Sequence, residues 1–391
     1  ENGAAAALVS REVACAGPQI VVDGVLGALG GLARYWRRKL DPCVIGITGS
    51  NGKTTTKEMV YAILRRRHQV LSTQGNYNNE LGLPLTLFEL SPDDEFAVLE
   101  MGAAKAGDIA YLAGIGLPDI GLITNVGPAH LEGFGDEPGV ARAKGELYES
   151  LQADGWAIMN ADQPWLDLWK ERSGAGHCLM FGHSRRCDVY TEESGGRRTI
   201  CTPRGSFELQ LALPGQHNVE NALAATAVAV AAGIDTNEIR DGLQSVRPIP
   251  GRLRLQQAPG GWAVIDDTYN ANPASLYAAL QVLATQGGEP WLVLGDMAEL
   301  GEYSRKMHAE MGEAACSLGV TRLFTVGEKS RFATDAFGTG ARHFPDIDAL
   351  LASLLTEIDS RVTCLVKGSR SMGMERVVEA ISRSGEVREA G

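Results

Sequence analysis

The chain has 391 residues, of which 36 are basic and 48 acidic, so its formal charge at pH 7 is -12. A chain of this length is expected to fold as two or three domains, each with its own core. The negative charge argues against a protein that binds nucleic acids through their phosphates, so we expect no nucleic-acid partner. Small anionic ligands must instead be held by local loops.

No segment predicts insertion into a membrane. The longest apolar run, residues 222–234, is mostly alanine and too short to cross a bilayer, so it predicts a packed helix. The chain begins Glu1-Asn2-Gly3, without Met or a basic stretch, so we expect no secretory signal and expect that residues are missing at the front. Seven scattered cysteines form no CxxC pair, which is typical of reduced thiols in a cytoplasmic protein.

The first forty residues predict one short strand, at 19–22, and one helix that ends in residues 35–39. This is too little structure to bury a core of its own. We therefore interpret residues 1–40 as the C-terminal remnant of a domain that begins earlier.

A phosphate-binding loop follows. The apolar run at 43–47 predicts a buried strand, and residues 49–55 read Gly-Ser-Asn-Gly-Lys-Thr-Thr. A strand, a glycine-rich turn and a helix place backbone N–H groups and a positive helix end around a polyphosphate. Lys53 would neutralise the β and γ phosphates, and the Thr54 hydroxyl would bind a phosphate-bound Mg²⁺. The loop therefore predicts ATP or GTP chemistry.

The spacing departs from the strict form of this loop, because Ile47 stands where the first glycine belongs. A plain turn is the alternative. Against it, the helix that would follow has one apolar face, made of Met59, Val60, Ile63 and Leu64.

Strand-like runs alternate with helical stretches along the rest of the chain, which predicts an α/β protein with mainly parallel sheets. We assign residues 41–246 to a central P-loop domain with strands at 96–99 and 121–124 and a β-hairpin excursion near 184–206. Two prolines and a glycine make residues 247–251 an interdomain linker. We assign residues 247–391 to a Rossmann-like domain. Its expected strands are 264–266, 291–294, 322–326 and 362–366.

Polar residues at the carboxyl ends of the central strands predict a site, because ligands of open α/β sheets bind in that crevice. Glu100 ends one strand, and His130 follows another after a short turn. Together they could hold a second divalent cation. Taken alone, His130 is better explained as a hydrogen-bonded loop histidine, and Lys144 as a solvated helix residue.

Many segments, taken in order, resemble the Mur ligases of peptidoglycan synthesis. These segments are residues 48–55, 75–82, 100–103, 130–135, 143–146, 215–221, 250–252, 266–273, 294–297 and 366–371. The resemblance implies that ATP phosphorylates a substrate carboxylate and that an amine then attacks the acyl phosphate. Within the family, the segments resemble the branch that joins UDP-N-acetylmuramoyl-tripeptide to D-alanyl-D-alanine, which implies these two partners and a cytoplasmic monomer.

The resemblance also implies residue roles. Catalytic roles fall to Lys53, Glu100, His130, Lys144 and Arg252. ATP would be bound by Gly49, Ser50, Asn51, Gly52, Lys53, Thr54, Thr55, Asn218, Asn221, Arg252, Asp267 and Asn270. The muramoyl substrate would meet Asn76 and Asn79, and the dipeptide Lys367, Ser369 and Arg370. Two Mg²⁺ ions would be held by Thr54, Glu100, His130 and Lys144, the last as a carbamate.

Simpler explanations remain for some of these residues. Asn218 could serve merely as a helix cap, and Asn76 and Asn79 could be merely parts of an Asn-rich turn. Many Mur ligases carry Asp before the metal-site histidine, whereas this chain has Ala129. Because Arg252 lies beyond the linker, we expect it to reach the phosphates only when two domains close, and we expect few contacts across the cleft without ligands.

Two other functions remain open. One is another amide ligase of the same superfamily, such as a folylpolyglutamate-type enzyme. The other is a P-loop switch that hydrolyses a nucleotide to change partners, which leaves Asn218, Arg252 and Asp267 unexplained.

Overall fold

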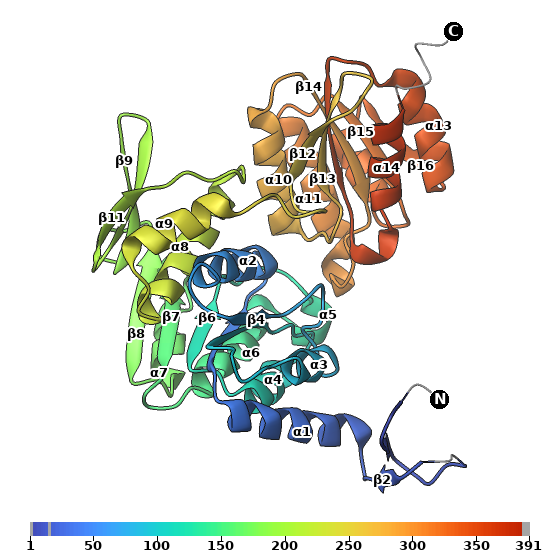
Figure 1. The fold of residues 1–391 in the computed structure, drawn as a ribbon. Coiled ribbons are helices and arrows are strands. Elements are labelled where there is room, and N and C mark those ends of the chain that lie inside the picture. The colour runs from blue at the N-terminus through green and yellow to red at the C-terminus, as the bar shows by residue number, and fades with distance from the viewer. Residues whose placement is uncertain (1–2, 15–16, 385–391) are drawn as a thin grey trace.

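A computed structural model of the chain describes residues 3–14 and 17–384 and contains three β-sheets (Figure 1). The α/β class with mainly parallel sheets is as expected. The first residues form two parallel strands, β1 (Ala7–Val9) and β2 (Gln19–Val21), followed by α1 (Val25–Leu40). The single strand predicted in this part therefore has a partner strand.

The central sheet has nine strands. Their order across the sheet is β11 (Gly205–Glu208), β10 (Arg197–Thr202), β9 (Val189–Ser194), β8 (His177–Gly182), β7 (Trp156–Asn160), β6 (Ile120–Ile123), β3 (Cys43–Thr48), β5 (Phe96–Glu100) and β4 (Val70–Ser72). All pairs from β4 to β9 are parallel, while β9, β10 and β11 pair antiparallel. The predicted hairpin excursion is thus a three-stranded meander that extends the main sheet.

Helices cover both faces of this sheet. One face carries α2 (Lys53–Leu64), α8 (Gln216–Ala231) and α9 (Thr236–Ser245), and the run at 222–234 lies mostly within α8, as expected of a packed helix. The other face carries α1, α3 (Gly82–Phe88), α4 (Asp108–Gly116), α5 (Leu131–Phe134), α6 (Glu137–Glu149) and α7 (Leu166–Arg172). Five of the six residues of β3 are buried, which explains its unbroken apolar sequence.

The C-terminal sheet has six strands in the order β12 (Arg254–Gln257), β13 (Ala263–Asp267), β17 (Val362–Lys367), β14 (Glu289–Gly295), β15 (Arg322–Val326) and β16 (Ala341–Phe344). Only the edge pair of β12 and β13 is antiparallel. One face packs against α10 (Pro273–Thr285), α11 (Ser304–Ser317) and α12 (Arg331–Phe337), and the other against α13 (Ile347–Glu357) and α14 (Glu375–Arg383). Single 3-10 turns lie at Gly301–Tyr303 (η1) and Arg370–Met372 (η2).

The strand order explains where a ligand can bind. β3 lies between β5 and β6. The connection that leaves β3 runs to β4 on one side of β3, and the connection that leaves β5 runs to β6 on its other side. Their carboxyl ends open into a crevice, which is where ligands of doubly wound sheets bind. Residues 248–250, between α9 and β12, have neither helix nor strand, as expected of the linker.

Six cysteines are free thiols, namely Cys43, Cys178, Cys187, Cys201, Cys316 and Cys364, whereas Cys15 lies outside the described residues. Over residues 3–14 and 17–384, no helix is both long enough and apolar enough to cross a membrane.

The contact between α2 and α9 leads to a stability prediction. A Cβ at Gly242 would lie 2.5 Å from Ile63 Cα, whereas a Cβ at Gly114 of α4 would meet no atom within 4 Å. Ala favours a helix more than Gly does at both positions, so the difference in unfolding free energy between the two variants measures the steric clash at Gly242. We expect Gly242→Ala to lower the free energy of unfolding in urea by about 1–3 kcal/mol and Gly114→Ala to leave it unchanged or raise it. Equal stability of the two variants would contradict this packing.

Candidate active site

A cavity of about 1130 Å³ lies between the phosphate-loop edge of the central sheet and the C-terminal domain. Most of the predicted site residues line it. They are Ser50, Asn51, Gly52, Lys53, Thr54, Thr55, Asn76, Asn79, Glu100, His130, Asn218, Asn221, Arg252, Asp267, Asn270, Lys367 and Arg370. Gly49, Lys144 and Ser369 do not line the cavity. Residues that are far apart in the chain therefore lie around one cavity.

Two glycines allow the phosphate loop its shape. Gly52 has a φ of 80°, which favours glycine, and a Cβ there would lie 2.2 Å from Asn221 Oδ1. At Gly49, with a φ of 149°, a Cβ would lie 1.9 Å from Thr124 Oγ1. The loop between β3 and α2 therefore packs directly against α8 on one side and the end of β6 on the other.

The turn after β6 braces the loop. The backbone N–H of Ser50 donates to Asn125 O at 2.9 Å, and that of Asn51 donates to Asn125 Oδ1 at 2.9 Å. The Ser50 hydroxyl donates to Gly127 O at 3.1 Å and accepts from Gly127 N at 3.0 Å. These bonds fix the loop before any ligand binds, which lowers the cost of ordering it around a polyphosphate.

Lys53, the first residue of α2, folds back over the loop. Its Nζ donates to Gly49 O at 2.7 Å and lies 3.5 Å from Ser50 O. Burial lowers the pKa of Lys53, and the charge of Arg252 lowers it further, while Glu100 acts in the opposite direction. Loop carbonyls are weak partners for a half-buried ammonium, so phosphate oxygens would hold this cation better.

Thr54 and Glu100 meet at the position expected for a metal ion. The Thr54 hydroxyl donates to Glu100 Oε2 at 2.8 Å, and Asn78 Nδ2 donates to Glu100 Oε1 at 2.8 Å. The register of β3 and β5, which pairs Ile47 with Glu100, brings this carboxylate beside the loop. A hydroxyl and a carboxylate side by side fit Mg²⁺, which takes few protein ligands and keeps several waters.

Arg252 reaches this pair from beyond the linker. Its Nη2 donates to Thr54 Oγ1 at 2.8 Å, and its guanidinium lies 4.2 Å from the centre of the Tyr269 ring. A second contact joins Asn272 Nδ2 to Asn51 Oδ1 at 2.7 Å. Arg252 and Asn272 therefore already reach the phosphate loop in this structure although the domains share few contacts, and domain closure on ligand binding stays a prediction.

Lys144 lies on the buried face of α6 and is 2% exposed, so it is not the solvated helix residue that its spacing alone allowed. Val140 and Tyr148, one turn away on either side, are buried with it. Its Nζ lies 5.9 Å from the centre of the Phe134 ring. Burial lowers the pKa of Lys144 strongly, and the charge of Lys53 lowers it further.

His130 caps the start of α5 in the left-handed region, with a φ of 54°. Its Nδ1 lies 2.6 Å from Oε2 of Glu299, a residue of the C-terminal domain. The approach is that of an ion pair rather than a well-aligned hydrogen bond, and Nδ1 is shielded from solvent. The contact with the His130 imidazole lowers the pKa of Glu299.

The start of α8 carries the two asparagines expected to contact the nucleotide. Asn218 Nδ2 donates to Pro214 O at 2.6 Å, and Asn221 Nδ2 donates to Asn218 Oδ1 at 3.1 Å. Asn221 Oδ1 accepts from Thr56 Oγ1 of α2 at 3.2 Å. The Asn218 side chain does not form the helix cap that was the simpler explanation, because Gly215 is the N-cap residue.

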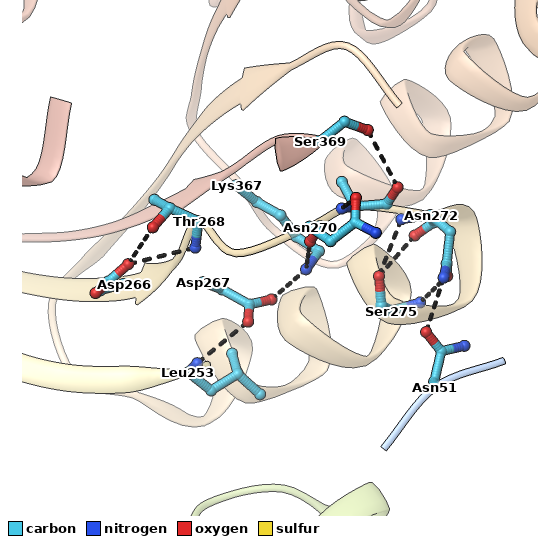
Figure 2. A network of polar contacts seen from close by, with 11 residues as sticks. Asn51, Leu253, Asp266, Asp267, Thr268, Asn270, Asn272, Ser275, Lys367 and Ser369 are labelled. Carbon is cyan, nitrogen blue, oxygen red and sulfur yellow. Dashed lines mark hydrogen bonds and ion pairs between the residues drawn. The ribbon is translucent and has the colours of Figure 1, made fainter. Parts of the chain in front are cut away.

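The C-terminal domain contributes a second polar group (Figure 2). Asp267 and Lys367 are register partners at the ends of β13 and β17 and form a buried ion pair. Asp267 Oδ1 also accepts from Leu253 N at 3.2 Å, and Lys367 Nζ donates to Asn270 O at 2.9 Å. Lys367 is thus already paired with the acidic residue expected near the ribose.

Two other predicted C-terminal residues differ in exposure. Ser369 is buried, and its hydroxyl accepts from Ala298 N at 2.7 Å. Arg370 is exposed, pairs with Glu375 at 3.1 Å and lines the cavity. Of these two, only Arg370 is free to meet a ligand without rearrangement.

The two asparagines predicted to bind the substrate lie in the loop before α3, and their hydrogen bonds differ. Asn79 Oδ1 accepts from Gly82 N at 2.8 Å and from Leu81 N at 3.2 Å, which is the Asn-rich turn of the simpler explanation. Asn76 is exposed and its side chain has no hydrogen bond within residues 3–14 and 17–384. Asn76 is therefore the freer of the two for a ligand.

Sequence reasoning missed four residues of the site: Asn78, Asn125, Asn272 and Glu299. The first three lie inside or beside segments that were singled out, so polar residues next to a motif could have been counted with it. Glu299 carries no local signal, because its partner His130 belongs to another domain. No group of three or more His, Cys, Asp or Glu residues in the described part of the chain could hold a metal ion by itself.

Comparison with known proteins agrees with this geometry. The Mur ligase middle domain matches residues 47–229, and the Mur ligase glutamate ligase domain matches residues 251–370. The chain is 42% identical, over 393 residues, to UDP-N-acetylmuramoyl-tripeptide--D-alanyl-D-alanine ligase of Escherichia coli (strain K12), covering 98% of this chain and 86% of that protein.

Two solved structures are similar to this chain over nearly its whole length. Crystal structure I of MurF from Acinetobacter baumannii superposes with a TM-score of 0.91 at 36% identity, covering 96% of this chain and 84% of that chain. MurF ligase from Thermotoga maritima in complex with ADP gives a TM-score of 0.88 at 29% identity, covering 99% and 90%.

The close approach at Gly52 predicts a loss of nucleotide binding. Gly52→Ala must displace either the loop or Asn221, and we expect ATP affinity, measured by isothermal titration calorimetry, to fall by about tenfold or more. Gly75→Ala is the matched control, because Gly75 also has a positive φ, of 53°, but a Cβ there meets no atom within 4 Å. Unchanged affinity in Gly52→Ala would show that the loop tolerates the contact.

Proposed function

The chain belongs to the Mur ligase family, and we propose that within it the protein is the ATP-dependent ligase that joins D-alanyl-D-alanine to UDP-N-acetylmuramoyl-tripeptide. It forms an amide bond, releases ADP and serves peptidoglycan precursor synthesis. The observation that carries this conclusion is the 42% identity to a ligase of this name over 98% of the chain. The convergence of Lys53, Thr54 and Arg252 in one cavity supports it.

The reaction has two transfers. The substrate carboxylate attacks the γ-phosphorus of ATP, the bond to the β-phosphate oxygen breaks, and ADP leaves. The amine of the dipeptide then attacks the acyl carbon, the bond to phosphate breaks, and the amine loses a proton. Lys53 and Arg252 approach the loop from two domains and would stabilise the charge that develops on the transferring phosphoryl group.

Mg²⁺ fits the residues present, because Thr54 and Glu100 offer two adjacent oxygens. We propose that Thr54, Glu100, His130 and a carbamylated Lys144 hold two such ions. When bound, Mg²⁺ neutralises phosphate charge and polarises the phosphoryl oxygens. The residues themselves orient the phosphates and keep the carboxylate beside them.

The buried amine of Lys144 supports the carbamate. Within residues 3–14 and 17–384, an ammonium at this position would be buried without an acidic partner, and burial lowers the pKa of Lys144 strongly, which favours the neutral amine. A neutral amine attacks CO₂, forms an N–C bond and releases a proton. The product is an anionic oxygen ligand in place of a cation.

Other residues bind the remaining groups of the substrates. We propose that the loop residues 49–55, with Asn218 and Asn221, bind the phosphates and nucleoside, and that Asp267 and Asn270 meet the ribose or base. Asn76 and Asn79 would contact the muramoyl substrate, and Lys367, Ser369 and Arg370 would help to position the dipeptide. We propose domains at residues 41–246 and 247–391, with residues 1–40 part of a substrate-binding unit, and a cytoplasmic monomer.

The acceptor dependence of phosphate release tests the function. We expect release from ATP only when both UDP-N-acetylmuramoyl-tripeptide and D-alanyl-D-alanine are present, because the acyl phosphate needs a carboxylate to form and an amine to resolve it. Lys53→Ala should abolish release, whereas Lys306→Ala, at an exposed surface site, should not. Turnover with ATP alone would favour a nucleotide switch, and a preference for folate and glutamate would favour a folylpolyglutamate-type ligase.

The carbamate predicts chemical rescue. Lys144→Ala should be nearly inactive, because the buried site then lacks an anionic ligand, and short carboxylic acids should restore part of the activity by occupying the space. Lys105→Ala, an exposed residue on the cavity rim, is the control for rescue and should gain nothing from the acids. Full activity of Lys144→Ala would refute the carbamate.

A further inference from the structure

We propose that Glu299 is the positioning residue for His130, so that the histidine presents one ring nitrogen to the divalent cation only while the C-terminal domain is docked. This inference rests on the proposed function, because it assigns the cation to His130. It concerns a residue that none of the family motifs in the sequence singled out.

The first observation is the contact itself. His130 Nδ1 lies 2.6 Å from Glu299 Oε2 and is shielded from solvent, while the His130 side chain lines the cavity and is 31% exposed. Nε2 is therefore the only ring nitrogen left to bind a ligand. A carboxylate on the other nitrogen is the usual partner of a metal-binding histidine, because it fixes the tautomer and the ring orientation. The residue before His130 is Ala129, which offers no carboxylate.

The second observation is that each of the three residues before Glu299 forms a hydrogen bond that holds the loop in place. Asp296 Oδ1 accepts from Ser330 N at 2.7 Å and from Lys329 N at 3.0 Å. Met297 N donates to Nε2 of the buried His308 at 2.9 Å, and Ala298 N donates to Ser369 Oγ at 2.7 Å. Ser369 is thereby linked to the positioning of Glu299.

The third observation is backbone conformation. Glu299 has a φ of 62° and His130 a φ of 54°, both in the left-handed region that side chains other than glycine rarely adopt. Such conformations persist only where the surrounding structure holds them, and they gather at functional sites. A backbone contact from Glu132 N to Glu299 O, at 3.5 Å, lies beside the ion pair. The two strained residues therefore face each other across the domain boundary.

Together these contacts make the histidine ligand depend on domain docking. When the C-terminal domain moves away, Glu299 leaves with it, and the His130 ring loses the carboxylate that orients it. When the C-terminal domain docks, Arg252 and Glu299 arrive at the site together, Arg252 beside Thr54 and Glu299 beside His130. The second half of the metal site is thus completed by the same movement that completes the phosphate site.

The test measures metal binding rather than turnover. Mn²⁺, a paramagnetic substitute for Mg²⁺, is titrated into the full chain with ADP present, and free Mn²⁺ is followed by electron paramagnetic resonance. Glu299→Gln keeps the size of the side chain and removes its charge, so we expect Mn²⁺ affinity to fall by about 10–100-fold. Glu302→Gln, three residues further on and exposed, is the matched control and should bind Mn²⁺ as the natural chain does.

A double-mutant cycle separates positioning from direct binding. If Glu299 acts through His130, the variant with both His130→Gln and Glu299→Gln binds Mn²⁺ as weakly as His130→Gln alone. Additive losses would overturn the proposal, because Glu299 would then bind the cation itself, and unchanged affinity in Glu299→Gln would overturn it too. If Glu299→Gln does not fold, Glu299→Asp keeps the charge at shorter reach and should bind Mn²⁺ with intermediate affinity.

The two proposals fail separately. Phosphate release without dependence on the two acceptors would refute the assigned reaction while leaving the Mn²⁺ cycle valid. A normal acceptor dependence with unchanged Mn²⁺ affinity in Glu299→Gln would refute only the role of Glu299.

Discussion

The site is organised by an excess of basic side chains that are buried or half-buried. Lys53 and Arg252 lie near Thr54 and Glu100, and Lys144 is close enough to Lys53 for the two charges to interact. The pKa values of both lysines are lowered by burial and by a neighbouring cation. Charges that are buried without partners destabilise a protein. A polyphosphate with its metal ions would offset this excess of positive charge, which favours the binding of ATP. Burial, and after it the charge of Lys53, lower the pKa of Lys144, which supports the proposed carbamate.

This charge arrangement requires a rigid backbone around it. Gly49 and Gly52 let the loop touch Thr124 and Asn221 directly, and a side chain at either position would displace the loop amides that are proposed to bind phosphate. The loop is anchored at both ends, by β3 in the middle of the sheet and by α2 packed on α8. Donors that are already in place lose little entropy when the ligand arrives, which favours both binding and transition-state stabilisation.

Local patterns in the sequence predicted the parts of the fold that have strong local signals. The strand, loop and helix around Lys53 were predicted because an apolar run, glycines and an amphipathic stretch follow one another. Short strands such as β4 and β16 were missed, since three or four residues carry little periodicity, and β7 and β8 were not distinguished from their surroundings. Lys144 was hard to place because burial of a lysine depends on tertiary packing, although Val140 and Tyr148 share its helical face. Glu299 could not be found, because only the docking of two domains brings it to His130.

The contacts between the domains are few and mostly polar. Arg252 meets Thr54, Asn272 meets Asn51 and Glu299 meets His130, while Met307 adds an apolar contact by packing against a core cluster of each domain. Each polar contact contributes only about 0.5–1.5 kcal/mol net, so the docked arrangement is held weakly compared with either domain core. Each also involves a residue of the proposed phosphate or metal site. Ligands that bind these residues therefore change the stability of the interface directly, which is the condition under which substrate binding can control domain closure.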